Sequence, residues 1–146
     1  MKKILVLHGP NLNLLGKREP EVYGSTTLAE IDEYLKAEAE RLDLSIETLQ
    51  SNHEGVLIDA LHQAREEASG VIINPGGLTH TSVSLRDAIA ASELPAVEVH
   101  LSNIFAREDY RRRSITAEAC VGMIAGFGWR SYLMALQALA ARLNNG

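Results

Sequence analysis

The sequence has little of several residue types, and each shortage excludes a class of protein. Its single cysteine, Cys120, has no partner for an internal disulfide, which fits a reducing cytoplasm. Aromatic residues make up only 5% of the chain, too few for the stacking platforms that bind single-stranded nucleic acid. The net charge is −5 and no long basic tract is present, so we expect no nucleic-acid partner.

Long apolar runs are also missing. No stretch approaches the roughly 20 residues that a membrane-spanning helix needs. The apolar run behind the basic N-terminus ends at Leu7, before Gly9 and Pro10, and is too short for a signal peptide. We therefore expect a cytoplasmic protein with no membrane contact. Its 146 residues, of which 46% are hydrophobic, are enough for a single domain over residues 1–146 with a real core.

Short apolar segments alternate with helical patterns along the chain. We expect strands at residues 3–7, 45–49, 71–73, 96–99 and 120–125. Short apolar strands separated by helices are typical of a parallel sheet that is covered on both faces. The sequence thus predicts an α/β fold, a flavodoxin-like three-layer α/β/α sandwich with a five-stranded parallel sheet of order 2-1-3-4-5. A Rossmann strand order is the alternative.

Two of the expected helices begin with a capping-box sequence. In this motif a Ser or Thr side chain and a Glu three residues later bond to each other's backbone N–H groups. Thr27 and Glu30 fit it before the first long helical pattern, and Ser51 and Glu54 fit it before the second. Both helices are therefore predicted to start directly after the Ser or Thr.

The remaining connections differ in regularity. Thr81 or Ser82 is expected to cap a third helix that ends near Ser92, and a last helix is expected over residues 129–143. Residues 103–119 have no helical period and are strongly basic. We therefore expect an irregular cationic segment between the fourth and fifth strands.

Polar side chains follow the first four expected strands. They lie at residues 8–11, 50–52, 74–80 and 98–103, and the first group continues into a cationic loop that ends at Tyr23. Right-handed crossovers bring the C-terminal ends of parallel strands to one edge, where open α/β sheets bind ligands. Each residue alone has a structural explanation, such as a turn or a solvated face. Their convergence predicts a site for a small polar anion at this edge.

Glu98 and His100 form a separate pattern within the fourth expected strand. Residues two apart in a strand point to the same side, and a buried carboxylate requires a partner. Glu98 is thus placed to orient His100 and to hold it protonated as a general acid. An ordinary ion pair between Glu98 and an arginine is the alternative.

Motifs for phosphate, redox cofactors and metals are incomplete. The segment from Gly9 to Lys17 resembles a Walker loop, but its glycines are too far apart and Arg18 occupies the Ser/Thr position. The glycines at 126 and 128 lack the third glycine and the following strand of a dinucleotide-binding motif. The five histidines form no HExxH motif. We expect neither a cofactor nor a metal.

Three segments, taken together, resemble the type II 3-dehydroquinate dehydratases nearly end to end. They are HGPNLNLLGKREPEVYG at residues 8–24, INPGGLTHTSVSLRDA at 73–88 and VEVHLSNIFAREDYRRRS at 97–114. The resemblance implies the flavodoxin-like fold and the loss of water from 3-dehydroquinate to give 3-dehydroshikimate. This reaction serves the shikimate pathway to aromatic amino acids, and the quinate-degrading pathway is the alternative.

The resemblance also implies catalytic roles for particular residues. Tyr23 is implied as the general base that removes a proton beside the substrate ketone, and Arg18 in the same loop as the cation that stabilises its tyrosinate form. Asn11 is implied to hold a water against the developing enolate oxygen. His100, oriented by Glu98, is implied to protonate the departing hydroxyl.

Binding roles follow from the same resemblance. The implied contacts to substrate hydroxyls and carboxylate come from Asn74, His80, Leu101, Ser102 and Arg111. Asp87 is implied to reach the site of a neighbouring subunit, because the family forms trimers that assemble four at a time into a dodecamer.

Other mechanisms and functions remain as alternatives. A lysine Schiff base, used by the other class of dehydroquinase, is disfavoured because no lysine stands at the C-terminal end of an expected strand. A different hydro-lyase acting on a small acid, on the same fold, would turn over another substrate. A non-catalytic binding module would show no turnover at all.

Overall fold

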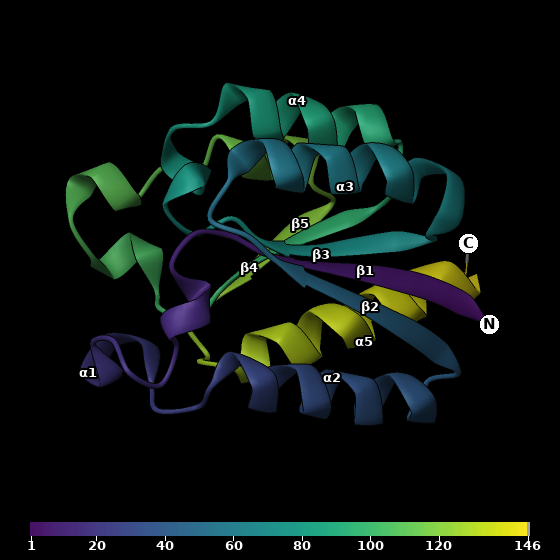
Figure 1. Ribbon diagram of the computed structural model, residues 1–146, viewed down its shortest axis with the longest axis horizontal. Coiled ribbons are helices and arrows are strands. Elements are labelled where there is room, and N and C mark those ends of the chain that lie inside the picture. The colour runs from purple at the N-terminus through teal and green to yellow at the C-terminus, as the bar shows by residue number, and fades with distance from the viewer. Residues whose placement is uncertain (146) are drawn as a thin grey trace.

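The computed structural model describes residues 1–145 and contains one sheet of five parallel strands, seen in the middle of Figure 1. The strands are β1 (Lys2–His8), β2 (Leu44–Gln50), β3 (Gly70–Asn74), β4 (Ala96–His100) and β5 (Gly122–Ala125). Their spatial order is β2-β1-β3-β4-β5, and every neighbouring pair is parallel. The predicted flavodoxin-like order is therefore confirmed, and the Rossmann order is excluded.

Helices cover both faces of the sheet and close two apolar cores. In Figure 1, α2 (Leu28–Arg41) and α5 (Arg130–Asn145) lie on one face, and α3 (Glu54–Glu67) and α4 (Val83–Ser92) lie on the other. The central strands are buried on both sides, so their apolar residues alternate between the two cores. Ile4 and Val6 of β1, for example, face α2 and α5, whereas Leu5 and Leu7 face α3 and α4.

The predicted caps of α2 and α4 are confirmed. The backbone N–H of Glu30 donates to the Thr27 hydroxyl at 3.2 Å, and the Thr27 N–H donates to the Glu30 carboxylate at 3.1 Å. Ser82, rather than Thr81, caps α4 by accepting a hydrogen bond from the backbone N–H of Leu85 at 2.9 Å. Local sequence is sufficient at these two ends because each motif is satisfied within one helical turn.

The second predicted capping box is wrong. Helix α3 begins at Glu54 after His53, whose side chain makes no capping bond. The Ser51 hydroxyl instead accepts from the backbone N–H of His53 at 2.9 Å, which forms a turn before the helix. The Glu54 carboxylate accepts a hydrogen bond from Ser82. Ser82, the residue that caps α4, thus takes the place of Ser51 as the partner of the Glu54 side chain.

The fifth strand begins later than predicted. Cys120 donates its backbone N–H to the Ala117 carbonyl at 3.0 Å and closes a 3-10 turn, η5 (Thr116–Ala119), so its expected place inside a strand is wrong. Two further 3-10 turns, η3 (Ile104–Ala106) and η4 (Asp109–Arg111), occupy the basic segment. The expected irregularity of residues 103–119 is confirmed. No helix among residues 1–145 is long and apolar enough to span a membrane.

Close backbone contacts hold the ends of β1 and β3 together. The Gly9 N–H donates to the Asn74 carbonyl at 2.8 Å, and a side chain at Gly9 would lie 2.5 Å from the Pro75 oxygen. Gly76 has a φ of 61°, and a side chain there would lie 2.9 Å from the Pro10 oxygen. Only glycine fits both positions. These contacts place the two loops side by side at the C-terminal edge of the sheet.

Candidate active site

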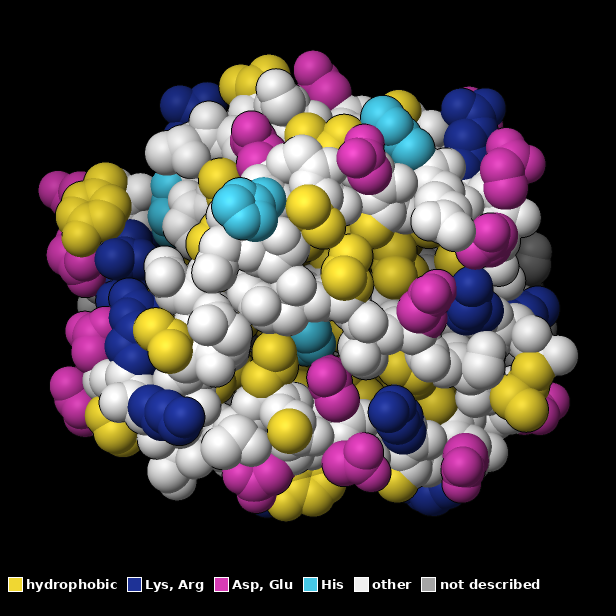
Figure 2. Space-filling view, in the orientation of Figure 1, with side chains coloured by type: hydrophobic (Ala, Val, Ile, Leu, Met, Phe, Trp, Pro, Cys, Tyr) yellow, Lys and Arg dark blue, Asp and Glu magenta, His cyan; other side chains and the backbone are white. Residues whose placement is uncertain are grey.

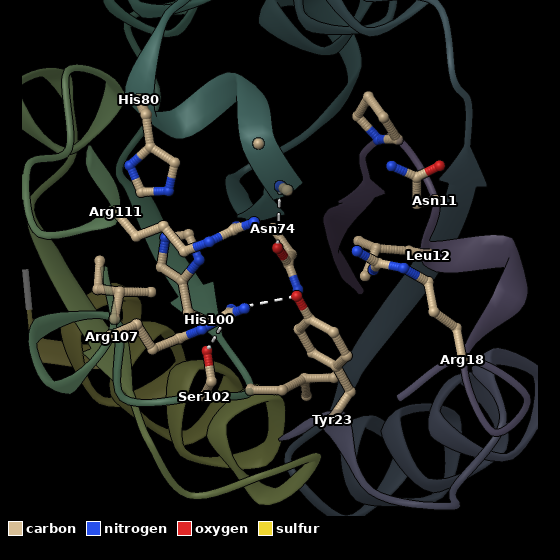
Figure 3. Close-up of a pocket in the computed structure, with 15 residues that line it drawn as sticks. Asn11, Leu12, Arg18, Tyr23, Asn74, His80, His100, Ser102, Arg107 and Arg111 are labelled. Atoms are coloured by element: carbon tan, nitrogen blue, oxygen red, sulfur yellow. Dashed lines mark hydrogen bonds between the residues drawn. The ribbon is translucent and has the colours of Figure 1, made fainter. Parts of the chain in front are cut away.

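A cavity of about 130 Å³ lies at the C-terminal edge of the sheet. Its walls come from the segments after β1, β3 and β4, together with the short helix α1 (Pro20–Tyr23). Figure 3 shows the lining residues: Pro10, Asn11, Leu12, Arg18, Tyr23, Asn74, Gly76, Gly77, His80, His100, Leu101, Ser102, Ile104, Arg107 and Arg111.

Tyr23 carries its hydroxyl into this cavity from the end of α1. The guanidinium of Arg107 donates to the Tyr23 oxygen at 3.1 Å and to the Ser102 hydroxyl at 3.3 Å, as the dashed lines in Figure 3 show. The guanidinium carbon of Arg18 lies 4.9 Å from the centre of the Tyr23 ring. Two cations therefore lie beside one phenol.

His100 lies at the end of β4 and is held by Glu98. The His100 Nε2 atom lies 2.8 Å from the Glu98 carboxylate and 3.3 Å from the Thr79 hydroxyl. Glu98 is fully buried. Because the carboxylate occupies Nε2, Nδ1 is the ring nitrogen left for a ligand in the cavity.

Hydroxyl groups complete the surroundings of Glu98. Ser114 donates to the carboxylate at 2.7 Å, and Thr116 donates to its other oxygen. Burial by itself raises the pKa of Glu98, but hydrogen bonds from His100 and the two hydroxyls, with the charge of His100, lower it below the ordinary value of 4.5. The carboxylate therefore stays ionised beside the His100 ring.

The polar groups on the opposite walls are also held in place. The Asn74 side-chain oxygen accepts from the Gly76 N–H at 3.1 Å. His80 Nδ1 lies 2.8 Å from the Arg113 carbonyl, so Nδ1 is the donor and Nε2 is left for a ligand. Asn11 has a left-handed φ of 71°, and its backbone N–H donates to Asn52 at 2.9 Å. These partners orient each group toward the shared space.

The site as a whole is cationic. Arg111 pairs with Glu108 at 2.9 Å. The hydrogen bond from Tyr110, followed by that from Arg111, lowers the pKa of Glu108 to about 2. Figure 2 shows Lys and Arg side chains grouped on the left of the molecule, where α1 and the segment after β4 lie. Arg18, Arg107 and Arg111 line the cavity, and none of the lining residues that the structure describes is an Asp or Glu, so the cavity suits an anionic ligand.

The structure brings together most of the predicted site residues. The residues that line the cavity are Asn11, Arg18, Tyr23, Asn74, His80, His100, Leu101, Ser102 and Arg111. Glu98 lies behind His100, as its spacing in the strand predicts. Asp87 lies apart on α4, where its exposed carboxylate pairs with Arg86 at 3.1 Å. His8, expected at this edge, is buried beneath the cavity and does not line it.

Arg107 was not among the predicted site residues. Its side chain is only 16% exposed, although a basic run in a loop is usually solvated. The available signal was its position five residues after Ser102, in the segment that also supplies Arg111. Ser114 and Thr116 were missed as well, because only the folded turn η5 brings them to Glu98.

Within residues 1–145, no group of three or more His, Cys, Asp or Glu side chains is placed to hold a metal ion. The titratable groups at the cavity are instead a tyrosine, two histidines and arginines. These groups can exchange protons and stabilise anions, which is the chemistry of proton abstraction and elimination.

Comparisons with known proteins agree with this arrangement. A family model described as dehydroquinase class II matches residues 2–140. A 3-dehydroquinate dehydratase from Nostoc sp. is 63% identical over 96% of this chain and 95% of its own length. Type II dehydroquinase structures from Butyrivibrio crossotus and Propionibacterium acnes each superpose with a TM-score of 0.93 at 40% identity, covering 94% and 97% of this chain and 97% of their own. The chain belongs to the class II dehydroquinase family.

Proposed function

We propose that this protein removes water from 3-dehydroquinate to give 3-dehydroshikimate. The observation that carries the proposal is that Tyr23, with two guanidinium groups around it, and His100, with Glu98 behind it, line one cavity. One is suited to act as a base and the other as an acid. The relatives named 3-dehydroquinate dehydratase support the choice of substrate.

In the first step, Tyr23 takes a proton from the carbon next to the substrate ketone. The ketone already acidifies this proton, so a tyrosinate is a sufficient base. Arg107 donates directly to the phenol oxygen and Arg18 lies over its ring, so both favour the tyrosinate form. We thus assign Arg107 a share in the role that the sequence suggested for Arg18.

The resulting enolate is stabilised electrostatically. Asn11 is positioned at the cavity wall to hold a water against the enolate oxygen. In the second step, His100 protonates the departing hydroxyl and water leaves. Glu98 keeps the imidazolium form favourable and fixes the ring through the 2.8 Å contact.

Substrate binding uses the remaining walls. Asn74, His80 and Arg111 bind the ring hydroxyls, while the Ser102 hydroxyl and the backbone of Leu101 bind the carboxylate. None of the four lysines lines the cavity, so the elimination proceeds without a Schiff base. The steps use only protein groups and the acidity of the substrate itself, so neither a cofactor nor a metal takes part. We place the reaction in the shikimate pathway.

We further propose that the protein assembles as a dodecamer of four trimers in which Asp87 reaches a neighbour's site. Asp87 is exposed and lies outside the cavity of its own chain, which leaves it accessible to another copy. Twelve chains of 15.9 kDa give a mass of about 190 kDa by light scattering. A monomer of undiminished activity would contradict this assembly.

The deciding experiment is an ultraviolet assay with 3-dehydroquinate, run with and without borohydride treatment in the presence of substrate. The conjugated product absorbs where the substrate does not. Absorbance that rises and survives borohydride supports the proposal. Activity lost to borohydride would indicate a lysine imine, and no change in absorbance from folded protein would indicate a binding module or another substrate.

A further inference from the structure

Residues 113–116 bond to two walls of the cavity without lining it themselves. They run from the end of η4 into η5. One of the two walls is the 3-10 helix η2 (Gly76–His80), and the other is the end of β4, which carries His100. Figure 3 shows His80 and His100 together on the left of the cavity. The segment is therefore placed to fix one histidine relative to the other.

The bonds to η2 come from backbone groups of the segment. The Arg113 carbonyl lies 2.8 Å from His80 Nδ1, and a carbonyl only accepts, so Nδ1 carries the hydrogen. The backbone N–H of Ile115 donates to the Thr79 carbonyl at 2.8 Å. Two residues of the segment thus hold the last two residues of η2, and Nε2 is the His80 nitrogen left for a ligand.

The bonds to β4 come from the side chains that alternate with these backbone groups. Ser114 donates its hydroxyl to one oxygen of Glu98 at 2.7 Å, and Thr116 donates to the other oxygen. His100 Nε2 lies 2.8 Å from the oxygen that Ser114 also contacts. A carboxylate only accepts, so both hydroxyls and Nε2 present hydrogens to it. Each oxygen of Glu98 therefore has a hydroxyl donor, and together the two donors fix the plane of the carboxylate.

Burial makes these hydroxyls important. Glu98, Thr116 and Thr79 are fully buried. The Thr79 hydroxyl lies 3.3 Å from His100 Nε2 and 3.5 Å from the Thr116 hydroxyl, so it packs between the ring and the segment. A buried carboxylate that loses a donor keeps an unpaired oxygen, which is costly. Without the Thr116 hydroxyl, we expect the carboxylate to turn toward another donor and the ring that it holds to shift.

We propose that Ser114 and Thr116 are positioning residues that hold the Glu98 carboxylate and, through it, keep His100 Nδ1 directed at the hydroxyl that leaves the substrate. The same four residues bond to η2, so the proton donor and the substrate-binding His80 depend on one segment. This inference rests on the proposed function for the identity of the substrate and for the role of His100 as the acid.

The first test is Thr116→Val, which keeps the shape of the side chain and replaces the hydroxyl by a methyl group. His100 acts when the hydroxyl leaves, so the loss should lower kcat and spare KM. We expect kcat for 3-dehydroquinate to fall about tenfold, which corresponds to one hydrogen bond to a charged group, with KM within about twofold. Thr48→Val is the matched control, because Thr48 lies on β2 beside a different cavity. It should change neither constant.

The second test separates the hydroxyl from its packing. Thr116→Ser keeps the hydroxyl and loses the methyl group, so its kcat should stay within about twofold of the wild type. Ser114→Ala removes the donor to the other oxygen and should lower kcat as Thr116→Val does. Ser114 is half-buried, so this variant decides the matter if Thr116→Val does not fold. An unchanged kcat in Ser114→Ala, or equal losses in Thr116→Val and Thr116→Ser, would overturn the proposal.

The third test needs no substrate. Crystal structures of the wild type, Thr116→Ser and Ser114→Ala report the position of the His100 ring directly. We expect the same ring position in the wild type and Thr116→Ser, and a turned Glu98 carboxylate with a displaced ring in Ser114→Ala. An unmoved ring in Ser114→Ala would overturn the proposal. If the wild type fails to dehydrate 3-dehydroquinate, the proposed function fails, while these structures still decide whether the hydroxyls position the ring.

Discussion

At the scale of single residues, the proposed chemistry depends on the charged groups around each side chain. Tyr23 is an ordinary phenol by composition, and its proposed role depends on the Arg107 hydrogen bond at 3.1 Å and on the Arg18 guanidinium over its ring. His100 depends in the same way on the buried Glu98 carboxylate. In both cases a charged side chain lies in contact with the group that we propose to be catalytic.

Removing the phenol oxygen tests the assignment of the base. Tyr23→Phe keeps the ring between the two guanidinium groups but has no group that can take a proton. We expect turnover of 3-dehydroquinate to be nearly abolished while ligand affinity, measured by calorimetry, is largely kept. Turnover like that of the wild type would exclude Tyr23 as the base.

Arg107 provides a second test at this scale. Arg107→Met removes the donor to the Tyr23 oxygen and, as with other electrostatic donors, should lower kcat about 100-fold. Arg65→Met is the matched control, because Arg65 pairs with Glu93, which lies apart from the cavity. Steady-state kinetics compare the two variants. Equal losses in both would show that only the overall charge matters.

At the scale of elements, helix ends and glycine contacts place these residues. Local capping motifs begin α2 and α4. At the start of α3, by contrast, Glu54 accepts a hydrogen bond from Ser82. The close approach of Gly9 to Pro75 joins the loops after β1 and β3. The site is therefore positioned by contacts between neighbouring loops as well as by the strands that carry them.

The capping box of α2 gives a prediction of stability. Thr27→Ala removes the hydroxyl that accepts from Glu30 and should cost about 1 kcal/mol, which lowers the melting temperature by roughly 3 °C. Ser25→Ala, an exposed neighbour that lies outside the helix, is the control. Scanning calorimetry measures both. An unchanged melting temperature for Thr27→Ala would mean that the cap contributes nothing.

At the scale of the whole molecule, the fold brings a buried charge under the active site and links it to pH. The folded pKa of Glu98 lies below its ordinary value of 4.5, so the unfolded chain binds this proton at higher pH than the folded protein does. Its contribution to the free energy of unfolding is therefore complete above pH 4.5. It is lost as the pH falls through the lowered folded value.

Denaturant titrations between pH 3 and 7 test this dependence. Glu98→Gln cannot titrate, so its free energy of unfolding should fall less steeply below about pH 4.5 than that of the wild type. Glu33→Gln, at an exposed position on α2, should keep the steeper fall of the wild type. A Glu98→Gln slope that matches the wild type would place the acid sensitivity in other groups.

The sequence by itself determined the alternation of strands and helices and the edge at which the polar segments meet, and it reduced the strand order to two alternatives between which the structure decided. These depend on short-range periodicity and on the handedness of crossovers, both of which can be recognised in one chain. It also predicted that Glu98 would stand beside His100, because a spacing of two in a strand decides the side.

Only the tertiary structure decided which distant groups touch. Arg107 bonds to Tyr23, which is 84 residues away in the sequence, and His8 bonds to Tyr132, which is 124 residues away. The predicted capping box at Ser51 is wrong for the same reason, because the Glu54 carboxylate is hydrogen-bonded to Ser82, 28 residues away in the sequence. Such pairs depend on how loops and helices pack over the sheet, and no local pattern of residues encodes that packing.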